Sequence, residues 1–362
     1  MKVGIVTIYD TDNMGNRLQN YALQQVLLQY ADQVVTLRNK PASGSKLSDW
    51  KRMSRLAEIP MLARLQKNLR KAKILQFNHR YIRLTRKCYW YNRGTSSLLP
   101  EDSCDLYCAG SDQIWNPDLE RSDLFSFMGF APAEQTFSYA ASFGISQIPE
   151  GHAEAVRAGL DHVAHISVRE ASGRDIVRDL TGRTDAQVLI DPTMLLTAQA
   201  WEPILQRPDA ALPGEYVLMY FLGGVSEERR AAIQAAADAL GCPVLDIMDP
   251  GSPYYHIGPA EFLYLIRNAR MMCTDSFHGS VFSFLWQRSL AIFPRDGGSM
   301  GSRIKTFADT FCLEDHTVQN EQVPQELLQP ADYSRGYAIL EEERKRSHAF
   351  IGNVFSSAKT CP

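Results

Sequence analysis

Short apolar runs alternate along this chain with segments whose apolar residues recur at helical spacing. Residues 2–8 form one apolar run, residues 18–31 carry apolar side chains on one helical face, and residues 33–37 form the next run. This order predicts a strand, a crossover helix and a parallel strand. The alternation continues with predicted strands at 105–109, 135–141, 165–169 and 186–190 and predicted helices at 152–160 and 171–180. The pattern predicts a doubly wound, Rossmann-like domain over residues 1–198.

A break in the pattern separates this series from a second one. Residues 197–215 contain three prolines and a glycine and show little periodicity, as a linker does. Alternation then resumes, with predicted strands at 216–222, 243–247, 271–274 and 290–293 and predicted helices at 226–240, 259–269 and 279–286. A second Rossmann-like domain is therefore predicted over residues 212–330, followed by a charged C-terminal helix over 334–358. The fold class we predict is α/β, with two doubly wound domains facing a cleft.

Composition agrees with a folded, water-soluble chain of two domains. The chain has 362 residues, 45% hydrophobic and 22% charged, which are ordinary values for globular proteins. No signal-peptide core or membrane span is evident, and the seven scattered cysteines fit reduced thiols, so we expect a cytoplasmic protein. We find no set of metal ligands and expect neither metal nor cofactor. The net charge of −3 means that anion binding must come from local clusters.

Residues 46–93 stand apart because they hold fourteen basic residues against two acidic ones, a net charge of +12. Apolar residues are interleaved at roughly helical spacing, which predicts a basic helical insertion in the N-terminal domain. Such a helix is typical of segments that lie on the anionic inner leaflet of a membrane. A solvated helix whose apolar stripe packs on the domain explains the pattern equally well. Nucleic-acid binding ranks third because no recognised motif accompanies the charge.

The strongest local signal is the stretch from Met271 to Leu285, MMCTDSFHGSVFSFL. A predicted strand ends near Thr274, and a predicted helix starts close to Gly279. Ligands of open α/β sheets bind at this kind of strand-to-helix turn, where backbone N–H groups and the helix dipole attract anions. His278 could donate a proton there, because the pKa of histidine lies near neutrality. A simple helix cap by Asp275 or Ser276 explains the same residues, and both interpretations stay open.

Two further polar stretches follow predicted strands of the first domain. In the stretch from Asn13 to Tyr21, Asn16, Arg17 and Asn20 could reach a ligand, or could form an ordinary polar turn. The second stretch is GSDQIWNP, residues 110–117, in which Asp112 could accept a proton from a sugar hydroxyl. Its further candidate ligand-binding residues are Gln113, Trp115 and Asn116. Trp115 could stack on a sugar ring, but a place in the core is the better explanation.

Two arginines complete the candidate site. Arg169 ends a predicted strand, and Arg303 follows a glycine pair at residues 297–298. The guanidinium fork matches the oxygen pairs of carboxylate and phosphate groups. Most arginines are surface residues or ion-pair partners, so the position at the end of an element is what distinguishes these two.

Taken in order, several segments resemble the polysaccharide pyruvyl transferase family. The resembling segments are NMGNRLQNYALQ (13–24), GSDQIWNP (110–117), SYAASFG (138–144), SVRE (167–170), DPT (191–193), residues 258–269, TDSFHGSVFSFL (274–285) and residues 302–306. They are distributed in order over residues 1 to about 315. TDSFHG and GSDQIWN are the most specific, and the ordered set is more specific than any member.

The resemblance implies a GT-B-like architecture and a transferase that uses phosphoenolpyruvate. Members of the family form a pyruvate ketal on a hexose of a cell-surface polysaccharide precursor, as in exopolysaccharide biosynthesis. Carried over by position, Arg169 and His278 would bind the donor, with His278 as general acid. Ser276, Phe277, Gly279 and Ser280 would complete the donor side in the C-terminal domain. The N-terminal domain would bind the acceptor, through Asn16, Asn20, Gln113, Trp115 and Asn116.

One departure from the family pattern affects the donor site. Some members carry an arginine two residues before the histidine, where this chain has Ser276, so Arg303 or Arg17 would have to supply that contact. Asp112 and Asp275 are the candidate bases. If the acceptor is lipid-linked, the basic segment would hold the enzyme at the inner face of the membrane. The residues predict no nucleic acid partner and leave the oligomeric state open.

Two other functions fit the same fold. A GT-B glycosyltransferase that uses a nucleotide sugar would share the architecture, because fold alone does not select a reaction. Such an enzyme usually offers a carboxylate for the ribose hydroxyls in its C-terminal domain, and no residue is convincingly placed for that role. A non-catalytic sugar- or phosphate-binding protein is the other alternative.

Overall fold

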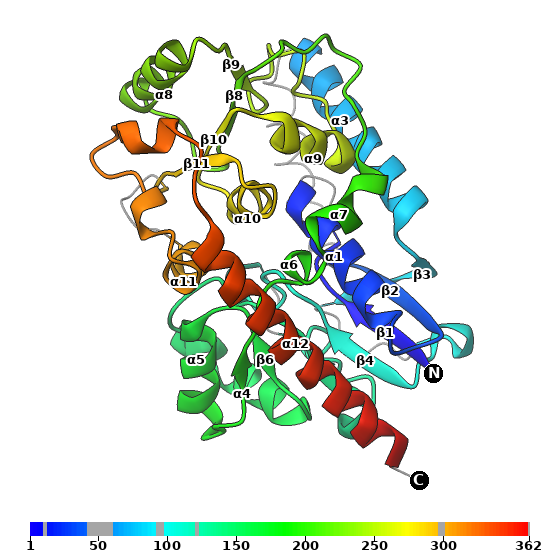
Figure 1. The fold of residues 1–362 in the computed structure, drawn as a ribbon. Coiled ribbons are helices and arrows are strands. Elements are labelled where there is room, and N and C mark those ends of the chain that lie inside the picture. The colour runs from blue at the N-terminus through cyan, green and yellow to red at the C-terminus, as the bar shows by residue number, and fades with distance from the viewer. Residues whose placement is uncertain (10–12, 42–60, 92–97, 120–122, 296–300, 361–362) are drawn as a thin grey trace. The chain divides into compact units, whose positions relative to one another are not determined.

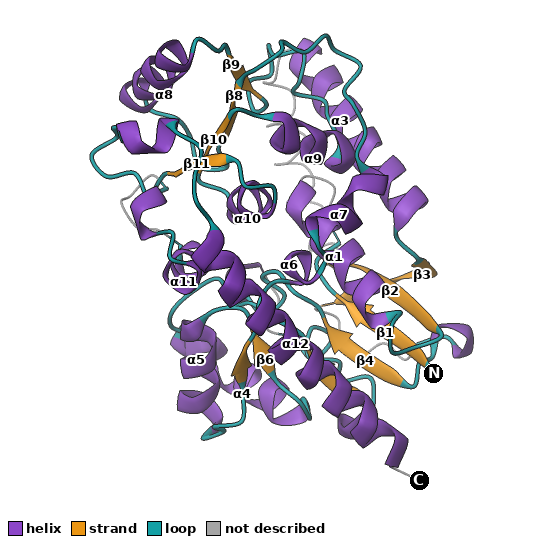
Figure 2. Ribbon diagram, viewed as in Figure 1, coloured by secondary structure: helices purple, strands orange, loops and turns teal. Residues whose placement is uncertain are grey.

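The structure is a computed structural model that describes residues 1–9, 13–41, 61–91, 98–119, 123–295 and 301–360. It divides into two compact units. The N-terminal unit comprises Met1–Arg52, Asn78–Leu196 and Glu342–Pro362, and the C-terminal unit comprises Met53–Phe77 and Thr197–Glu341. Each unit contains a parallel sheet with helices, which Figures 1 and 2 show. The predicted α/β class is thereby confirmed, while the predicted cleft stays a prediction.

The N-terminal unit is built on a five-stranded parallel sheet with the order β3-β2-β1-β4-β5. Its strands are β1 (Lys2–Val6), β2 (Gln33–Pro41), β3 (Leu84–Tyr91), β4 (Leu106–Ala109) and β5 (Thr136–Ser138). A separate parallel pair joins β6 (Ser167–Val168) to β7 (Gln187–Val188). Strand β1 lies at the centre, where Val3, Ile5 and Val6 are fully buried. This position explains its continuous apolar sequence, since central parallel strands are covered on both faces.

The helices of the N-terminal unit begin in different ways, two of them at a side-chain cap. They are α1 (Met14–Leu27), α4 (Ala153–His162), α5 (Ala171–Thr181) and the short α6 (Pro192–Leu195). Asn13 caps α1 by accepting a hydrogen bond from the N–H of Gly15, and Asp191 caps α6 in the same way through the N–H of Thr193. Pro192 takes the first position of α6, where a missing N–H costs nothing.

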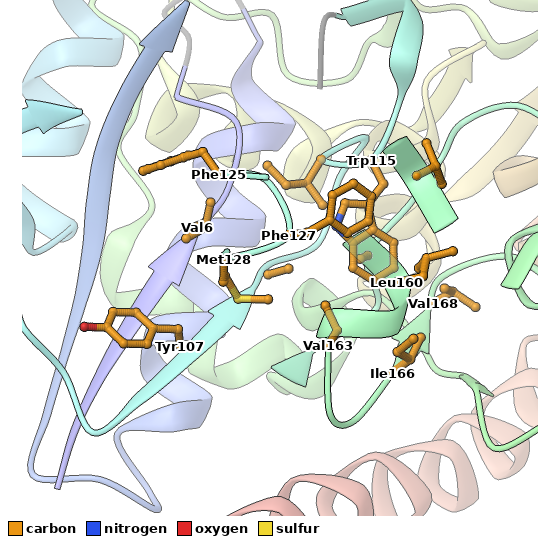
Figure 3. Close-up of a cluster of buried hydrophobic side chains, with 14 of the residues drawn as sticks. Val6, Tyr107, Trp115, Phe125, Phe127, Met128, Leu160, Val163, Ile166 and Val168 are labelled. Carbon is orange, nitrogen blue, oxygen red and sulfur yellow. The ribbon is translucent and has the colours of Figure 1, made fainter. Parts of the chain in front are cut away.

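An aromatic cluster forms much of the core of this unit (Figure 3). The indole of Trp115 is stacked on Phe127, with ring centroids 5.1 Å apart, and donates a hydrogen bond to the carbonyl of Ser126. Phe143 and Leu160 pack in the same cluster. Burying several large rings in one place supplies much of the apolar area that stabilises the unit.

The C-terminal unit contains a four-stranded parallel sheet with the order β11-β10-β8-β9. Its strands are β8 (Val217–Tyr220), β9 (Val244–Asp246), β10 (Met271–Thr274) and β11 (Ser289–Ile292). Its helices are α7 (Ala198–Trp201), α8 (Glu227–Leu240), α9 (Pro259–Asn268), α10 (Phe277–Leu285) and α11 (Ser302–Phe311). Every predicted strand in both series overlaps an observed one.

The basic segment is partly different from its prediction. Residues 61–81 form helix α3 (Met61–Tyr81), as expected, whereas residues 84–91 form strand β3 and not helix. Strand β3 is an edge strand of the sheet and is paired in parallel with β2. Residues 46–60 and 92–93 lie outside the described part. The unit boundary also differs from the predicted insertion, because Met53–Phe77 groups with the C-terminal unit.

The predicted last helix is α12 (Ser334–Thr360). Its first part belongs to the C-terminal unit, where Tyr337 donates a hydrogen bond to the carbonyl of Leu285. Its later part belongs to the N-terminal unit, where Arg344 donates to the carbonyls of Met194 and Leu196 at 2.8 and 3.0 Å. Each part of α12 therefore completes the packing of its own unit.

Candidate functional site

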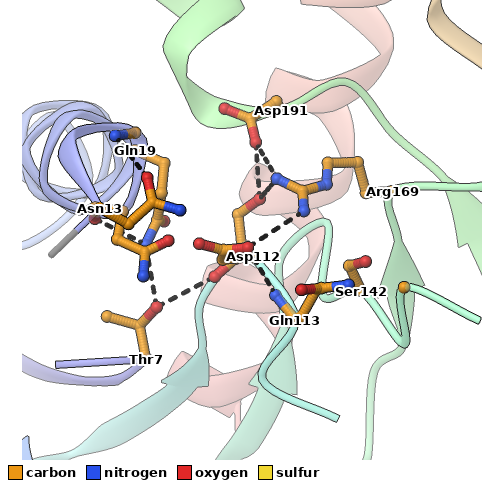
Figure 4. Close-up of polar contacts among 12 residues, drawn as sticks. Thr7, Asn13, Gln19, Asp112, Gln113, Ser142, Arg169 and Asp191 are labelled. Carbon is orange, nitrogen blue, oxygen red and sulfur yellow. Dashed lines mark hydrogen bonds and ion pairs between the residues drawn. The ribbon is translucent and has the colours of Figure 1, made fainter. Parts of the chain in front are cut away.

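Buried polar side chains gather where the strands of the N-terminal unit end (Figure 4). Thr7 follows β1, Ser111 and Asp112 follow β4, and Arg169 follows β6. The hydroxyl of Thr7 donates to the carbonyl of Ser111 over 3.0 Å, and the Ser111 hydroxyl donates to Asp191 over 2.9 Å. Parallel strands bring their carboxyl ends to one edge, so residues distant in sequence meet here.

Arg169 carries the positive charge of this cluster. Its Nη1 donates to Asp191 Oδ2 at 2.5 Å and to the Ser111 hydroxyl at 3.2 Å, and its Nη2 lies 3.5 Å from Asp112 Oδ1. The side chains of Arg169, Asp191 and Asp112 are 2%, 0% and 6% exposed. Burial disfavours the cation, yet Asp191, Asp112 and Glu170 together raise the pKa of Arg169 above its ordinary value. Arg169 is thus a buried, permanently charged group that already faces carboxylates.

Asp112 occupies a strained backbone position. Its φ of 77° lies in the left-handed region, which a non-glycine residue adopts at a cost of roughly 1–3 kcal/mol. Its carbonyl accepts a hydrogen bond from the N–H of Ser142, and its Oδ1 accepts one from the N–H of Gln113. Gly144, also at positive φ, leaves room for the Gln113 side chain, since a Cβ there would come within 1.7 Å of it. The turn therefore fixes the position of the Asp112 carboxylate.

Glu170 accepts hydrogen bonds from the neighbouring loop after β5. Its Oε1 accepts hydrogen bonds from the Ser142 hydroxyl and the N–H of Phe143, both at 2.9 Å, and from the N–H of Gly144 at 3.1 Å. The side chain is fully buried. Glu170 thereby holds the loop that supports the Asp112 turn.

The predicted residues near the start of α1 are also buried. Arg17 donates to the carbonyl of Ile8 and lies over the Tyr9 ring, 5.2 Å from its centroid. Asn20 Oδ1 accepts from the Thr36 hydroxyl at 2.7 Å. Asn16 accepts at its carbonyl from Gln19. Arg17 and Asn20 therefore connect α1 to the region of β1 and β2 by hydrogen bonds. Their predicted ligand contacts stay predictions.

The residues that follow Asp112 differ in burial and in contacts. Trp115 is fully buried among Phe127 and Phe143, so it has no exposed face on which a sugar ring could stack. The core explanation holds for Trp115. Asn116 Oδ1 accepts from the N–H of Asp118 and shapes a turn. Gln113 is partly exposed.

In the C-terminal unit, the predicted turn joins β10 to α10 as the sequence indicates. The Thr274 hydroxyl donates to the Tyr220 carbonyl at 2.6 Å and accepts from the N–H of Ser276 at 3.0 Å. Ser276 caps α10 by accepting from the N–H of Gly279 at 3.3 Å. His278 lies in the first turn of α10 and is 5% exposed. No acidic residue occupies that turn, so the positive end of the helix dipole is not neutralised by its own side chains.

Asp275 has a positioning role in the same unit. The fully buried carboxylate accepts from the N–H groups of Leu222 and Gly223 at 2.7 and 2.8 Å, and its Oδ2 lies 3.6 Å from Arg295 Nε. The loop after β8 is therefore tied to the turn after β10. A Cβ on Gly223 would come within 3.0 Å of Asp275 Oδ2, which explains the glycine at that position.

The remaining predicted donor residues lie on α10 and α11. The Phe277 ring packs edge-on against His278 and Phe307. The Ser280 hydroxyl donates to the carbonyl of Ser276 at 3.0 Å. Arg303 is partly exposed in the first turn of α11. The glycine pair at 297–298 lies outside the described residues.

Sequence reasoning gave no role to three residues that organise these clusters. Asp191 and Ser111 contact Arg169 directly, and Glu170 holds the loop after β5. The available signal for Asp191 was its place between an apolar run and Pro192, which indicates a buried helix cap. Arg295 beside Asp275 gave no comparable signal.

The described part of the chain holds neither a cluster of metal ligands nor a membrane-spanning helix. Outside residues 10–12, 42–60, 92–97, 120–122, 296–300 and 361–362, no three His, Cys, Asp or Glu side chains gather in a group that could hold a metal ion. Within the part of the chain that the structure describes, every helix falls short of the length or apolar character needed to cross a bilayer.

Parallel sheets with polar clusters at the carboxyl ends of their strands place this protein among the Rossmann-like α/β proteins, which bind ligands at that edge. A sequence model of one family, described as polysaccharide pyruvyl transferase, matches residues 13–286. The chain belongs to the polysaccharide pyruvyl transferase family. The match includes Asp112, Arg169 and His278, and the family indicates a transferase.

Comparison with solved structures gives weaker similarities. Arabidopsis thaliana UGT89C1, solved with UDP-L-rhamnose, is 12% identical, with 99% of this chain and 98% of that chain covered and a TM-score of 0.46. Apo UGT2 of Phytolacca americana is 11% identical over 99% and 95% of the two chains, with a TM-score of 0.38. The E. coli heptosyltransferase WaaC with ADP is 13% identical over 95% and 100%, with a TM-score of 0.35. No curated protein matches the chain.

Proposed function

We propose that this protein transfers the pyruvyl group of phosphoenolpyruvate to a hexose of a cell-surface polysaccharide or its lipid-linked precursor, forming a ketal. The observation that carries the proposal is the family match over residues 13–286, within which His278 occupies the first turn of α10. The helix dipole and the acid-free first turn favour an anionic ligand at that place.

The proposed reaction balances without a redox partner or a metal. The C3 methylene of phosphoenolpyruvate takes up a proton, which makes C2 electrophilic, and a sugar hydroxyl adds to C2 while its own proton passes to a base. The bond between C2 and the phosphate oxygen breaks, and inorganic phosphate leaves. A second hydroxyl of the same sugar then attacks C2, loses its proton and closes the ketal.

We assign the proton delivery to His278, because an imidazole can carry a proton near neutral pH. For the base we favour Asp112, which follows β4, over Asp275, whose carboxylate holds the loop after β8 through two backbone amides. The donor contacts predicted for Arg17, Arg169, Arg303, Ser276, Phe277, Gly279 and Ser280 stay part of the proposal. So do the acceptor contacts predicted for Asn16, Asn20, Gln113 and Asn116.

Donor binding can be tested by thermal unfolding of the full-length protein. Phosphoenolpyruvate should raise the melting temperature, because a ligand that binds only the folded state stabilises it. UDP is the comparison ligand. Stabilisation by UDP and not by phosphoenolpyruvate would contradict the proposal and favour a nucleotide-sugar glycosyltransferase.

Transfer can be tested with methyl glycosides of glucose, galactose and mannose as acceptor probes. Mass spectrometry should detect the added pyruvyl group together with released phosphate. The His278→Gln variant should lose turnover by about 10²–10⁴-fold, the usual contribution of a general acid. His152→Gln, a histidine before α4, is the matched control and should keep full turnover. Equal turnover in both variants would remove His278 from the mechanism.

A further inference from the structure

The stretch from Ile59 to Pro100 contains no aspartate or glutamate. It holds ten of the 38 lysines and arginines, which leaves 28 basic against 41 acidic residues in the remainder of the chain. The positive charge of an otherwise acidic protein is therefore concentrated in this stretch, and helix α3 makes up half of it. Such a concentration of positive charge attracts anionic partners.

The inner face of α3 is occupied by contacts within the C-terminal unit. Arg70 is buried, and its Nη1 lies 3.4 Å from the carbonyl oxygens of Ile247 and Tyr255. Its guanidinium lies over the Tyr255 ring, 5.3 Å from the centroid. Lys73 Nζ contacts Glu261 Oε1 at 2.6 Å, and Glu261 in turn accepts from the N–H of Gly258 at the start of α9. These contacts fix the rotation of α3 and so determine which residues point outward.

The outer face of α3, as we use the term, consists of Asn68, Leu69, Ala72, Leu75, Gln76 and His79, all exposed. Leu69 and Leu75 are 43% and 47% exposed and are two of the five large hydrophobic side chains exposed in the described structure. At 100° per residue, Lys71 borders this face beside Leu75, and Arg80 borders it beside Leu69. Exposed leucines flanked by long cationic side chains are a feature of helices that lie in a membrane interface.

We propose that the outer face of α3 docks on an anionic lipid surface. The basic side chains would attract the headgroups, and Leu69 and Leu75 would enter the boundary of the acyl chains. The two exposed leucines favour lipid over nucleic acid, because a phosphate backbone offers them no apolar partner. The residues of this face include neither His278 nor Asp112, so the vesicle test does not depend on the proposed reaction.

The test uses full-length protein and sedimentation with vesicles, with and without added salt. Vesicles of phosphatidylcholine mixed with phosphatidylglycerol should carry the protein down, whereas vesicles of phosphatidylcholine alone should not. Salt should release the protein, because the attraction is partly electrostatic. In Lys71→Gln/Arg80→Gln, binding should weaken about five-fold per charge removed. In Leu69→Asn/Leu75→Asn, binding should fall by roughly ten-fold or more.

Each variant has a matched control elsewhere in the chain. Leu119→Asn/Leu124→Asn replaces two leucines that are 43% and 46% exposed. Arg157→Gln/Lys345→Gln removes two exposed basic side chains from α4 and α12. Both controls should bind anionic vesicles like the native protein, and melting temperatures would confirm that all four variants are folded.

Three results would overturn the proposal. They are equal sedimentation with both kinds of vesicle, equal loss in the controls and in the α3 variants, and unchanged vesicle binding by the α3 variants. A gel-shift titration with single-stranded DNA adds a direct comparison. If the α3 variants lost DNA binding while keeping vesicle binding, the face would belong to a nucleic-acid partner and the lipid assignment would be wrong.

Discussion

The substitution Asp191→Asn tests whether Arg169 depends on its buried carboxylates. The change keeps the size of the side chain and an oxygen to cap α6, but it removes the charge that lies 2.5 Å from Arg169 Nη1. Arg169 would remain charged, because its pKa is raised, and its nearest remaining carboxylate would be Asp112 at 3.5 Å. Removing one partner of a buried ion pair typically costs about 3–5 kcal/mol. The retained Asp112 contact places the expected loss near the lower end of this range, about 3 kcal/mol.

Urea unfolding followed by circular dichroism would measure the loss, and hydrogen exchange would locate it in peptides of the N-terminal unit. Asp175→Asn is the matched control, because Asp175 forms an ion pair with Arg178 on α5. The side chains of this pair are about half exposed, and the substitution removes the same charge. The control should show no measurable loss, since solvent screens such a pair. If Asp191→Asn were as stable as the control, Arg169 would not need Asp191, and the account of this cluster would be wrong.

Three further predictions concern the C-terminal unit. Arg229 donates to both oxygens of Glu321 at 2.6 Å and lowers the pKa of the Glu321 carboxyl. The ion pair therefore contributes its full stability above the pKa of glutamate in the unfolded chain, about 4.3. This contribution is lost as the pH falls through the lower pKa of Glu321 in the folded protein. In acid-unfolding titrations Glu321→Gln should remove this part of the pH dependence, and an unchanged profile would count against the pair. Gly279→Ala should lower the free energy of unfolding in urea by roughly 1–3 kcal/mol, because a Cβ would come within 2.9 Å of the Thr274 hydroxyl, which is held by hydrogen bonds. An unchanged free energy of unfolding would show that the turn can shift to make room for the methyl group. Burial raises the pKa of the Cys273 thiol to about 12, so iodoacetamide should leave it unmodified until the protein is unfolded, and mass spectrometry of the native protein would reveal any labelling.

Hydrophobic periodicity was enough to predict most of the fold. The segments 2–8 and 271–274 are mostly apolar because β1 and β10 are interior strands of their sheets. Their burial can therefore be predicted from the sequence. Strand β3 was wrongly predicted as part of a helix, because it is an edge strand whose basic residues resemble those of helix α3 before it. The pairing of β3 with β2 depends on tertiary contacts that local sequence does not encode.

The candidate site was predictable in its positions and less so in its interactions. The sequence placed Asp112, Arg169 and His278 after strands, because strand ends can be read from the pattern. It could not show that Asp191 neutralises Arg169 or that Asp275 holds the loop after β8, since both contacts join segments far apart in the chain. Trp115 illustrates the same point, because only the fold decides whether an indole faces solvent or core.

The attachment of α3 has a consequence for synthesis on the ribosome. Arg70 and Lys73 precede their partners Ile247 and Glu261 by 177 and 188 residues. At typical translation speeds these partners emerge roughly 10–40 s after α3. During that interval the residues that hold Arg70 and Lys73 have not yet been synthesised, so chaperones or the anionic surfaces of the cell have time to engage this cationic, leucine-bearing segment before the second unit is complete.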